Sequence, residues 1–246
     1  MKNNKGLLMG MAAIALSFGL MFASCGGDDS DDSGGLPGIT EETTGQATIT
    51  GKDIALSGDG VPASLAEQTD YNGAKFSITG GKFSFTLPAA PSYLYSFSTS
   101  GLDSYLFEDT DGDLAPTVSS ADAKFTLVSY FSWNSGSNYY SISRQSLDTD
   151  DATYMNRNQI LYVYADTDVT LSRSAKTWKE DSSKSIQARA SSGSYTYNWG
   201  AVNLILKKGW NLVQIDSNTT VTGESIKKSA TVKIADKDVP WTFSDK

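Results

Sequence analysis

Aspartates that alternate around a glycine form the clearest chemical pattern in the sequence. In "EDTDGDLAP" they are Asp109, Asp111 and Asp113, with Gly112 between the last two. A tight loop of this kind turns several oxygens toward one hard cation, so the pattern indicates a structural calcium site. The match to an EF-hand loop is partial, because the twelfth position counted from Asp109 is Ser120 and not glutamate.

The tripeptide Asp-Thr-Asp recurs at residues 148–150 and 166–168, so two further loops offer oxygen ligands. Asp, Thr and Gly are also favoured in turns between strands whether or not a metal binds. Two interpretations therefore stay open. These aspartates either hold a structural calcium ion or are turn residues in a protein without a cofactor.

A second cluster that could bind a ligand is aromatic. The segment "FSWNSGSNYYS" surrounds Trp133, Tyr139 and Tyr140 with Ser, Asn and Gly. Rigid flat rings beside adaptable hydrogen-bonding groups serve both sugar stacking and protein recognition. The alternative is a hairpin whose aromatics point inward at alternate positions. Under the first interpretation the three residues bind a glycan or a protein ligand.

Composition excludes much of catalysis. The chain has no histidine and one cysteine, so it has no Ser-His-Asp or Cys-His mechanism and no imidazole base. It also lacks a P-loop and the dinucleotide-type glycine motif. A carboxylate pair of the glycosidase type would remain, but it needs a defined separation and one raised pKa. We therefore expect a protein that is not an enzyme and has no catalytic residues.

The elements that must position these residues are strands. Short segments alternate polar and apolar residues with period two and end at Gly, Asn, Asp or Ser, which is typical of β-strands. The fold class predicted is all-β, an antiparallel β-sandwich made of one large or two small domains. The predicted strand segments lie within residues 47–51, 74–88, 92–99, 123–132, 160–166, 168–172, 194–199, 202–215 and 230–236.

Two hairpins are predicted from glycine-containing turns. "KFSITGGKFSF" should turn at Gly80 and Gly81, and "NLILKKGWNLVQI" should turn near Lys208 and Gly209. Trp210 and Tyr162 follow the strand pattern and are expected in the core. Beyond the N-terminal apolar run, the best helical candidate is "VPASLAEQ".

Two longer segments resemble known bacterial proteins. "GGKFSFTLPAAPSYLYSF" resembles the closing strands of prealbumin-like or carboxypeptidase-regulatory-like β-sandwiches. "ILYVYADTDVTL" followed by "NLILKKGWNLVQI" is similar to the C-terminal halves of spirochaete and Bacteroidetes lipoproteins without an assigned activity. These resemblances imply a first β-sandwich segment at residues 46–118 and a second at 119–246, with the pattern broken at "PTVSSADA".

The N-terminus has the layout of a secretory signal peptide. Lys2 and Lys5 precede "GLLMGMAAIALSFGLMF", an uncharged apolar run of 17 residues followed by acidic residues. "FASC" resembles a bacterial lipobox, with Phe22 where leucine is usual. That resemblance implies a signal peptide over residues 1–24 and lipidation of Cys25 by a thioether-linked diacylglycerol and an amide-linked acyl chain such as palmitate. The alternative is an ordinary signal peptide that is cleaved near Ala23.

Residues 25–45 contain many carboxylates and glycines and almost no large apolar side chain, so we expect a flexible, disordered acidic tether. The acidic run resembles the export signal of Bacteroidetes-type surface lipoproteins. The expected location is the outer membrane, at its cell-surface or periplasmic face. The partner there is the membrane, contacted through the lipid anchor.

The formal charge of −8 argues against nucleic acid as a partner, because such a field repels phosphate backbones. We expect an anchored lipoprotein whose β-domain has a binding or structural role. One alternative is a carbohydrate-binding component of a nutrient-uptake system. Another is a fimbrial subunit-like assembly protein, which would need an acceptor groove for strand exchange.

Overall fold

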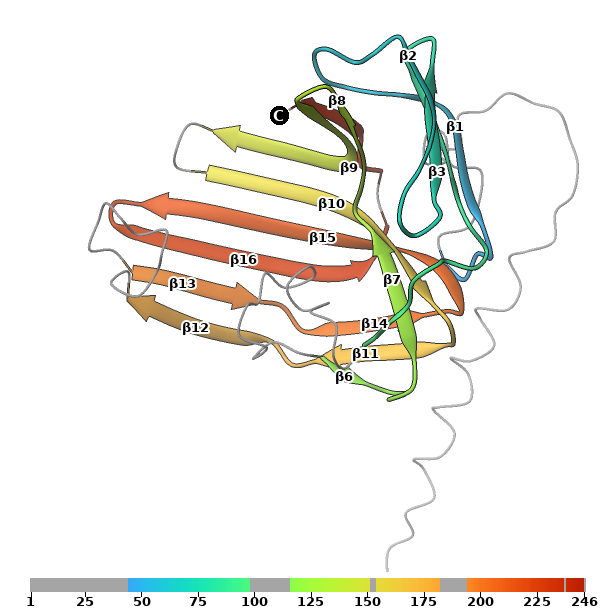
Figure 1. Cartoon of the computed structure of the whole chain (residues 1–246). Helices are drawn as coiled ribbons and strands as arrows, with labels where there is room; N and C mark the ends of the chain where they lie inside the picture. Colours follow the sequence, from blue (N-terminus) through green and yellow to red (C-terminus); the bar gives the residue numbers. More distant parts are fainter. Residues whose placement is uncertain (1–43, 98–115, 151–153, 182–193, 237, 246) are drawn as a thin grey trace, which may run out of the picture. The chain divides into compact units, whose positions relative to one another are not determined.

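The computed structural model describes residues 44–97, 116–150, 154–181, 194–236 and 238–245, all within the unit Gly35–Lys246. In these ranges every regular element is a strand, which confirms the predicted all-β class. The same ranges contain no helix long and apolar enough to cross a bilayer. The strands form three sheets, and Figure 1 labels most of them.

The first sheet is antiparallel, in the order β1-β4-β3-β2. Its hairpin turns at Gly80 and Gly81, whose φ angles of 59° and 74° suit glycine and match the predicted turn. The segment "VPASLAEQ" forms edge strand β2 and not a helix, because pairing with β3 overrides its local propensity. The bounds are β1 (Ile49–Ala55), β2 (Ser64–Thr69), β3 (Lys75–Thr79) and β4 (Lys82–Leu87).

The second sheet has ten strands, and its long members run side by side in Figure 1. Its pairings are antiparallel except for β13 with β16, which is parallel. The strands are β5 (Tyr95–Ser96), β7 (Lys124–Val128), β8 (Tyr130–Ser135), β9 (Asn138–Asp150), β10 (Tyr154–Ala165), β12 (Lys176–Asp181), β13 (Ser194–Trp199), β15 (Gly209–Thr222), β16 (Ser225–Ile234) and β17 (Trp241–Asp245).

The third sheet joins β14 (Val202–Leu206), β11 (Val169–Arg173) and β6 (Thr117–Val118). β14 and β15 therefore lie in different sheets, and the hairpin predicted near Lys208 and Gly209 is wrong. The chain crosses between sheets there. The Asn211 side chain accepts from the Lys207 N–H and donates to the Lys207 and Gly209 carbonyls, which fixes the crossing.

Hydrophobic cores cover both faces of the ten-stranded sheet at the C-terminal half of β10. Ile160, Tyr162 and Tyr164 pack with the β1–β4 sheet, whereas Leu161 and Val163 pack with the three-stranded sheet. Successive residues of a strand point to opposite faces, so the C-terminal half of β10 is buried on both sides. Trp210 and Tyr162 lie in the first core, as predicted.

The segment predicted at 46–118 contributes strands to both sheets of the segment predicted at 119–246. β5 and β6 lie in the first segment, but they pair with β7 and β11 of the second. The boundary at "PTVSSADA" stays a prediction.

Candidate functional site: a groove on the ten-stranded sheet

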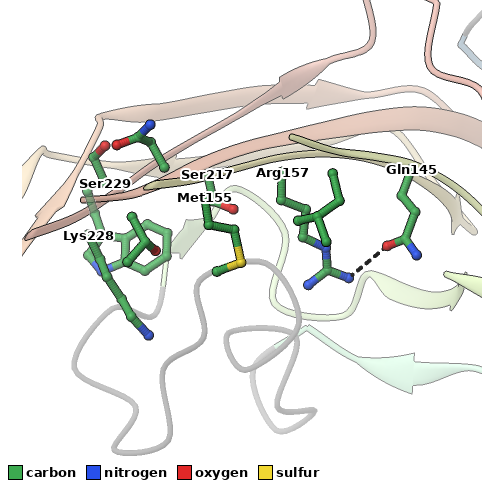
Figure 2. Close-up of a pocket in the computed structure, with 10 residues that line it drawn as sticks. Gln145, Met155, Arg157, Ser217, Lys228 and Ser229 are labelled. Carbon is green, nitrogen blue, oxygen red and sulfur yellow. Dashed lines mark hydrogen bonds between the residues drawn. The ribbon is translucent and has the colours of Figure 1, made fainter. Parts of the chain in front are cut away.

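A groove of about 250 Å³ lies on the extended part of the ten-stranded sheet (Figure 2). The register of the strands explains its position. Two rows of side chains cross one face of the sheet, the same face that packs on the three-stranded sheet farther along. One row is Leu147 on β9, Arg157 on β10, Ser217 on β15, Ala230 on β16 and Trp199 on β13. The other row is Met155 on β10, Thr219 on β15, Lys228 on β16 and Tyr197 on β13.

Side-chain size across these rows makes the hollow. Ser217, Thr219 and Ala230 are short and occupy the middle strands, β15 and β16, so they form the floor. Longer side chains rise on either side of them. Figure 2 shows Met155, Arg157 and Lys228 extending from one side of the sheet. The groove is thus built by a change of residue size across the strands.

Both charged groups that line the groove are cations. Of the ten described lining residues, Arg157 and Lys228 carry positive charge and none carries a carboxylate. The chain as a whole has 28 acidic and 20 basic residues, so this face differs in sign from the average surface. The groove therefore favours an anion or a polar ligand rich in acceptors.

Stacked aromatics continue the wall on the β13 side. Trp178 on β12 stacks on its cross-strand partner Tyr197 with ring centroids 4.7 Å apart and planes 8° apart. Trp199 is only 6% exposed, and its buried indole N–H has no acceptor among the described residues. Trp178 also stacks on Trp199, with ring centroids 6.5 Å apart, so the stacked pair supports the one aromatic ring among the described lining residues.

Apolar side chains form the opposite rim. Leu147 is 59% exposed and Met155 is 41% exposed, although both project from the face that elsewhere carries a core. Exposed apolar side chains beside a hollow are a common feature of binding sites.

The aromatics predicted to bind a ligand divide between two faces. Trp133 and Tyr140 are partners in the β8–β9 hairpin, stack with ring centroids 5.4 Å apart and pack against the first core. Tyr139 pairs with Asn134 and projects from the other face of the hairpin. For Trp133 and Tyr140 the structure has the inward hairpin arrangement, and the three residues do not form one platform.

The predicted calcium ligands Asp109, Asp111 and Asp113 lie outside the described residues, as does the predicted lipidation residue Cys25. The described Asp166 and Asp168 act as turn residues. Asp166 accepts from the Lys124 N–H at 2.8 Å, and Asp168 accepts from the Lys208 N–H at 2.9 Å. Among the described residues no group of acidic side chains is placed to hold a metal ion.

Sequence reasoning missed Arg157 and Lys228 as site residues. The two strands that carry them are joined only through β15, so their proximity depends on strand order and register. The one available signal was the run of short polar residues "DSNTT" in β15, where a fully covered strand would continue the apolar alternation.

A second hollow of about 470 Å³ lies beside β1 and the connection that precedes β17. Next to it, Arg144 is buried and donates to the Asp238 carboxylate at 2.9 Å and to the Val239 carbonyl at 3.0 Å. Burial raises the pKa of the Tyr162 hydroxyl, and the neighbouring Arg144 guanidinium opposes that rise. Arg144 and Tyr162 belong to the first core, so we assign this cluster a structural role.

The chain matches no family model, no curated protein and no solved structure.

Proposed function

We propose that this protein is a lipoprotein anchored to the bacterial outer membrane through Cys25, and that its β-domain is a binding module and not an enzyme. The lipobox-like "FASC" supports the anchor. Residues 25–45 serve as the tether that holds the domain away from the lipid surface.

One observation carries the binding role: the groove on β10, β15, β16 and β13 combines two cations, floor hydroxyls and the Trp199 ring, and none of its ten described lining residues is acidic. A hollow with a few convergent polar groups is the usual form of a ligand site. Carboxylate and imidazole, the commonest general bases, are absent from the ten described lining residues. This set of groups suits holding a ligand more than transforming one.

A carbohydrate-binding role in nutrient uptake is the second candidate, and a specific feature favours it. The hydroxyls of Ser217 and Thr219 and the amide of Gln145 are groups that exchange hydrogen bonds with sugar hydroxyls. The floor strands β15 and β16 are each paired on both sides. A partner therefore cannot enter the groove by adding a strand, which argues against strand exchange at this site.

A broad glycan array probed with the detergent-solubilised full chain tests the binding role. We expect a restricted set of glycans to bind. An array without any bound glycan, together with no binding to peptide or phosphate probes, would remove the binding role and leave a structural one.

A further inference from the structure

We infer that the groove takes an acidic saccharide, whose carboxylates bind Arg157 and Lys228 while its hydroxyls meet the floor. This inference rests on the proposed binding function and narrows its ligand to one chemical class. It begins from a difference between the two faces of the sheet: on one face a lysine is paired with carboxylates, and on the other a lysine has no such partner among the described residues.

Lys228 has no ion-pair partner among the described residues, whereas Lys233 on the same strand has two. On the opposite face of β16, Lys233 lies 2.6 Å from Asp236 and 3.8 Å from Asp216. Adjacent residues of a strand face opposite sides, so the carboxylates that neutralise Lys233 are turned away from Lys228. The ammonium group of Lys228 is left to face the groove (Figure 2).

Arg157 is oriented by a neutral group and not by a carboxylate. Its Nη2 donates to Gln145 Oε1 at 3.3 Å, the bond drawn in Figure 2. This is the one hydrogen bond of the Arg157 side chain to a described residue. The main chain of Gln145 is itself fixed, because its backbone N–H donates to the Pro240 carbonyl and its backbone carbonyl accepts from the Thr242 hydroxyl. The guanidinium is thus positioned without an ion pair to any described carboxylate, which suits bidentate binding of a ligand carboxylate.

The two cations flank the floor. Arg157 is paired with Ser217, and Lys228 is paired with Thr219 two residues along β15. One strand separates β10 from β16, so the cation-bearing strands lie about 10 Å apart across the sheet. An anionic ligand that reaches both cations must lie over the hydroxyls of Ser217 and Thr219. The floor then supplies donors and acceptors for ligand hydroxyls.

A saccharide fits this arrangement better than an acidic peptide. The backbone groups of β15 and β16 are engaged with their neighbours, so a peptide backbone finds no ladder to extend. The groups that remain are side-chain hydroxyls, an amide and two cations, which match a chain of hydroxyls and carboxylates. Trp199, supported by the stacked rings of Trp178 and Tyr197, provides a stiff boundary for the apolar C–H face of a sugar ring.

The test is titration calorimetry of the detergent-solubilised full chain with an oligogalacturonate and with the same oligosaccharide methyl-esterified at its carboxylates. Binding of the acid form should weaken with added salt, and the ester should bind at least tenfold more weakly. Arg157→Gln and Lys228→Gln should each weaken binding of the acid form about tenfold, which corresponds to about 1.4 kcal/mol. Lys227→Gln is the matched control, because Lys227 lies next to Lys228 on the opposite face, and it should keep the affinity.

The outcomes separate this inference from the proposed function. Equal affinity for acid and ester, or unchanged affinity in both groove variants, would overturn the anionic ligand and leave a glycan-binding module. Binding of an oligoglutamate peptide in place of the oligosaccharide would overturn the saccharide class. If neither of these probes nor any glycan on the array binds, the proposed function itself fails. Melting curves of each variant check that the fold is retained.

Discussion

The guanidinium of Arg144 lies 2.9 Å from the carboxylate of Asp238, and the two side chains have very different surroundings. The Arg144 side chain is 1% exposed, whereas that of Asp238 is 47% exposed. The carboxylate therefore reaches from the surface to neutralise a cation enclosed by the first core. Removing Asp238 would leave a charged group in an apolar environment without its counter-ion.

Asp238→Ala should therefore lower the free energy of unfolding by about 2–4 kcal/mol, because a buried charge that loses its partner keeps its desolvation cost. Urea unfolding measures the change. The matched control is Asp236→Ala, which breaks the exposed pair with Lys233 and should cost about 1 kcal/mol or less. Equal effects of the two substitutions would show that burial of Arg144 does not set the strength of its ion pair.

Neighbouring apolar residues of β14 offer a test of the three-sheet arrangement. Leu204 lies in the second core at 1% exposure, whereas Ile205 is 53% exposed. Leu204→Ala should destabilise the protein by about 2–5 kcal/mol, and Ile205→Ala should stay within about 0.5 kcal/mol. If chemical denaturation gave the reverse order, β14 would present the opposite face to the ten-stranded sheet.

The pKa values of two aspartates should depart from the ordinary value in opposite directions. Partial burial raises the pKa of Asp70 despite the hydrogen bonds that it accepts from the Ala74, Asn72 and Gly73 N–H groups. The Lys208 N–H and the Lys207 ammonium lower the pKa of Asp168. The pH dependence of the carboxyl carbon shifts, measured by NMR, should give a pKa above about 3.8 for Asp70 and below about 3.8 for Asp168.

The stability consequences have opposite signs. Asp70 binds its proton more tightly in the folded state, so its contribution is present at low pH and is lost as pH rises through the raised pKa. Asp168 contributes stability above about pH 3.8 that is lost as pH falls through its lowered pKa. Asp168→Asn should therefore flatten the acid side of the stability profile. A lower pKa for Asp70 than for Asp168 would contradict at least one of the two assignments.

Membrane attachment should depend on one atom, the sulfur of Cys25. Cys25→Ala removes the acceptor of the lipid chains, so the variant should lose fatty-acid labelling and leave the membrane fraction. Fractionation after labelling with a palmitate probe measures both effects. Ser24→Ala, which preserves a small residue before the cysteine, should stay labelled and attached. A Cys25→Ala protein that still labels and sediments with membranes would contradict the lipobox interpretation.

Local patterns in the sequence predicted the Gly80–Gly81 turn and many of the strands, because both depend on neighbouring residues, but they missed β2, β12 and β17. The same patterns failed where pairing is decided at long range. The alternation in "NLILKKGWNLVQI" is compatible with a hairpin, but β14 pairs with β11 and β15 pairs with β10 and β16. "VPASLAEQ" has helical propensity, yet its residues from Ser64 onward pair with the edge of β3 as part of β2.

The site was harder to predict than the strands. Trp133 and Tyr140 stood out through their composition, and they pack against the first core. Arg157 and Lys228 had no local signal, because their proximity arises from strand order and from a match of registers across β15. A single-residue slip would turn both cations to the opposite face, and the sequence alone does not give that register.

Occupying the floor of the groove tests the central claim most directly. Ser217→Phe places a large ring between Arg157 and Lys228, whereas Thr220→Phe places the same ring on the opposite face of β15. The measurement is the oligogalacturonate affinity of the two full-length variants and of the unmodified chain by titration calorimetry. We predict that Ser217→Phe loses binding and Thr220→Phe keeps it, with both proteins folded. Unchanged affinity in a folded Ser217→Phe variant would contradict the assignment of this groove as the ligand site.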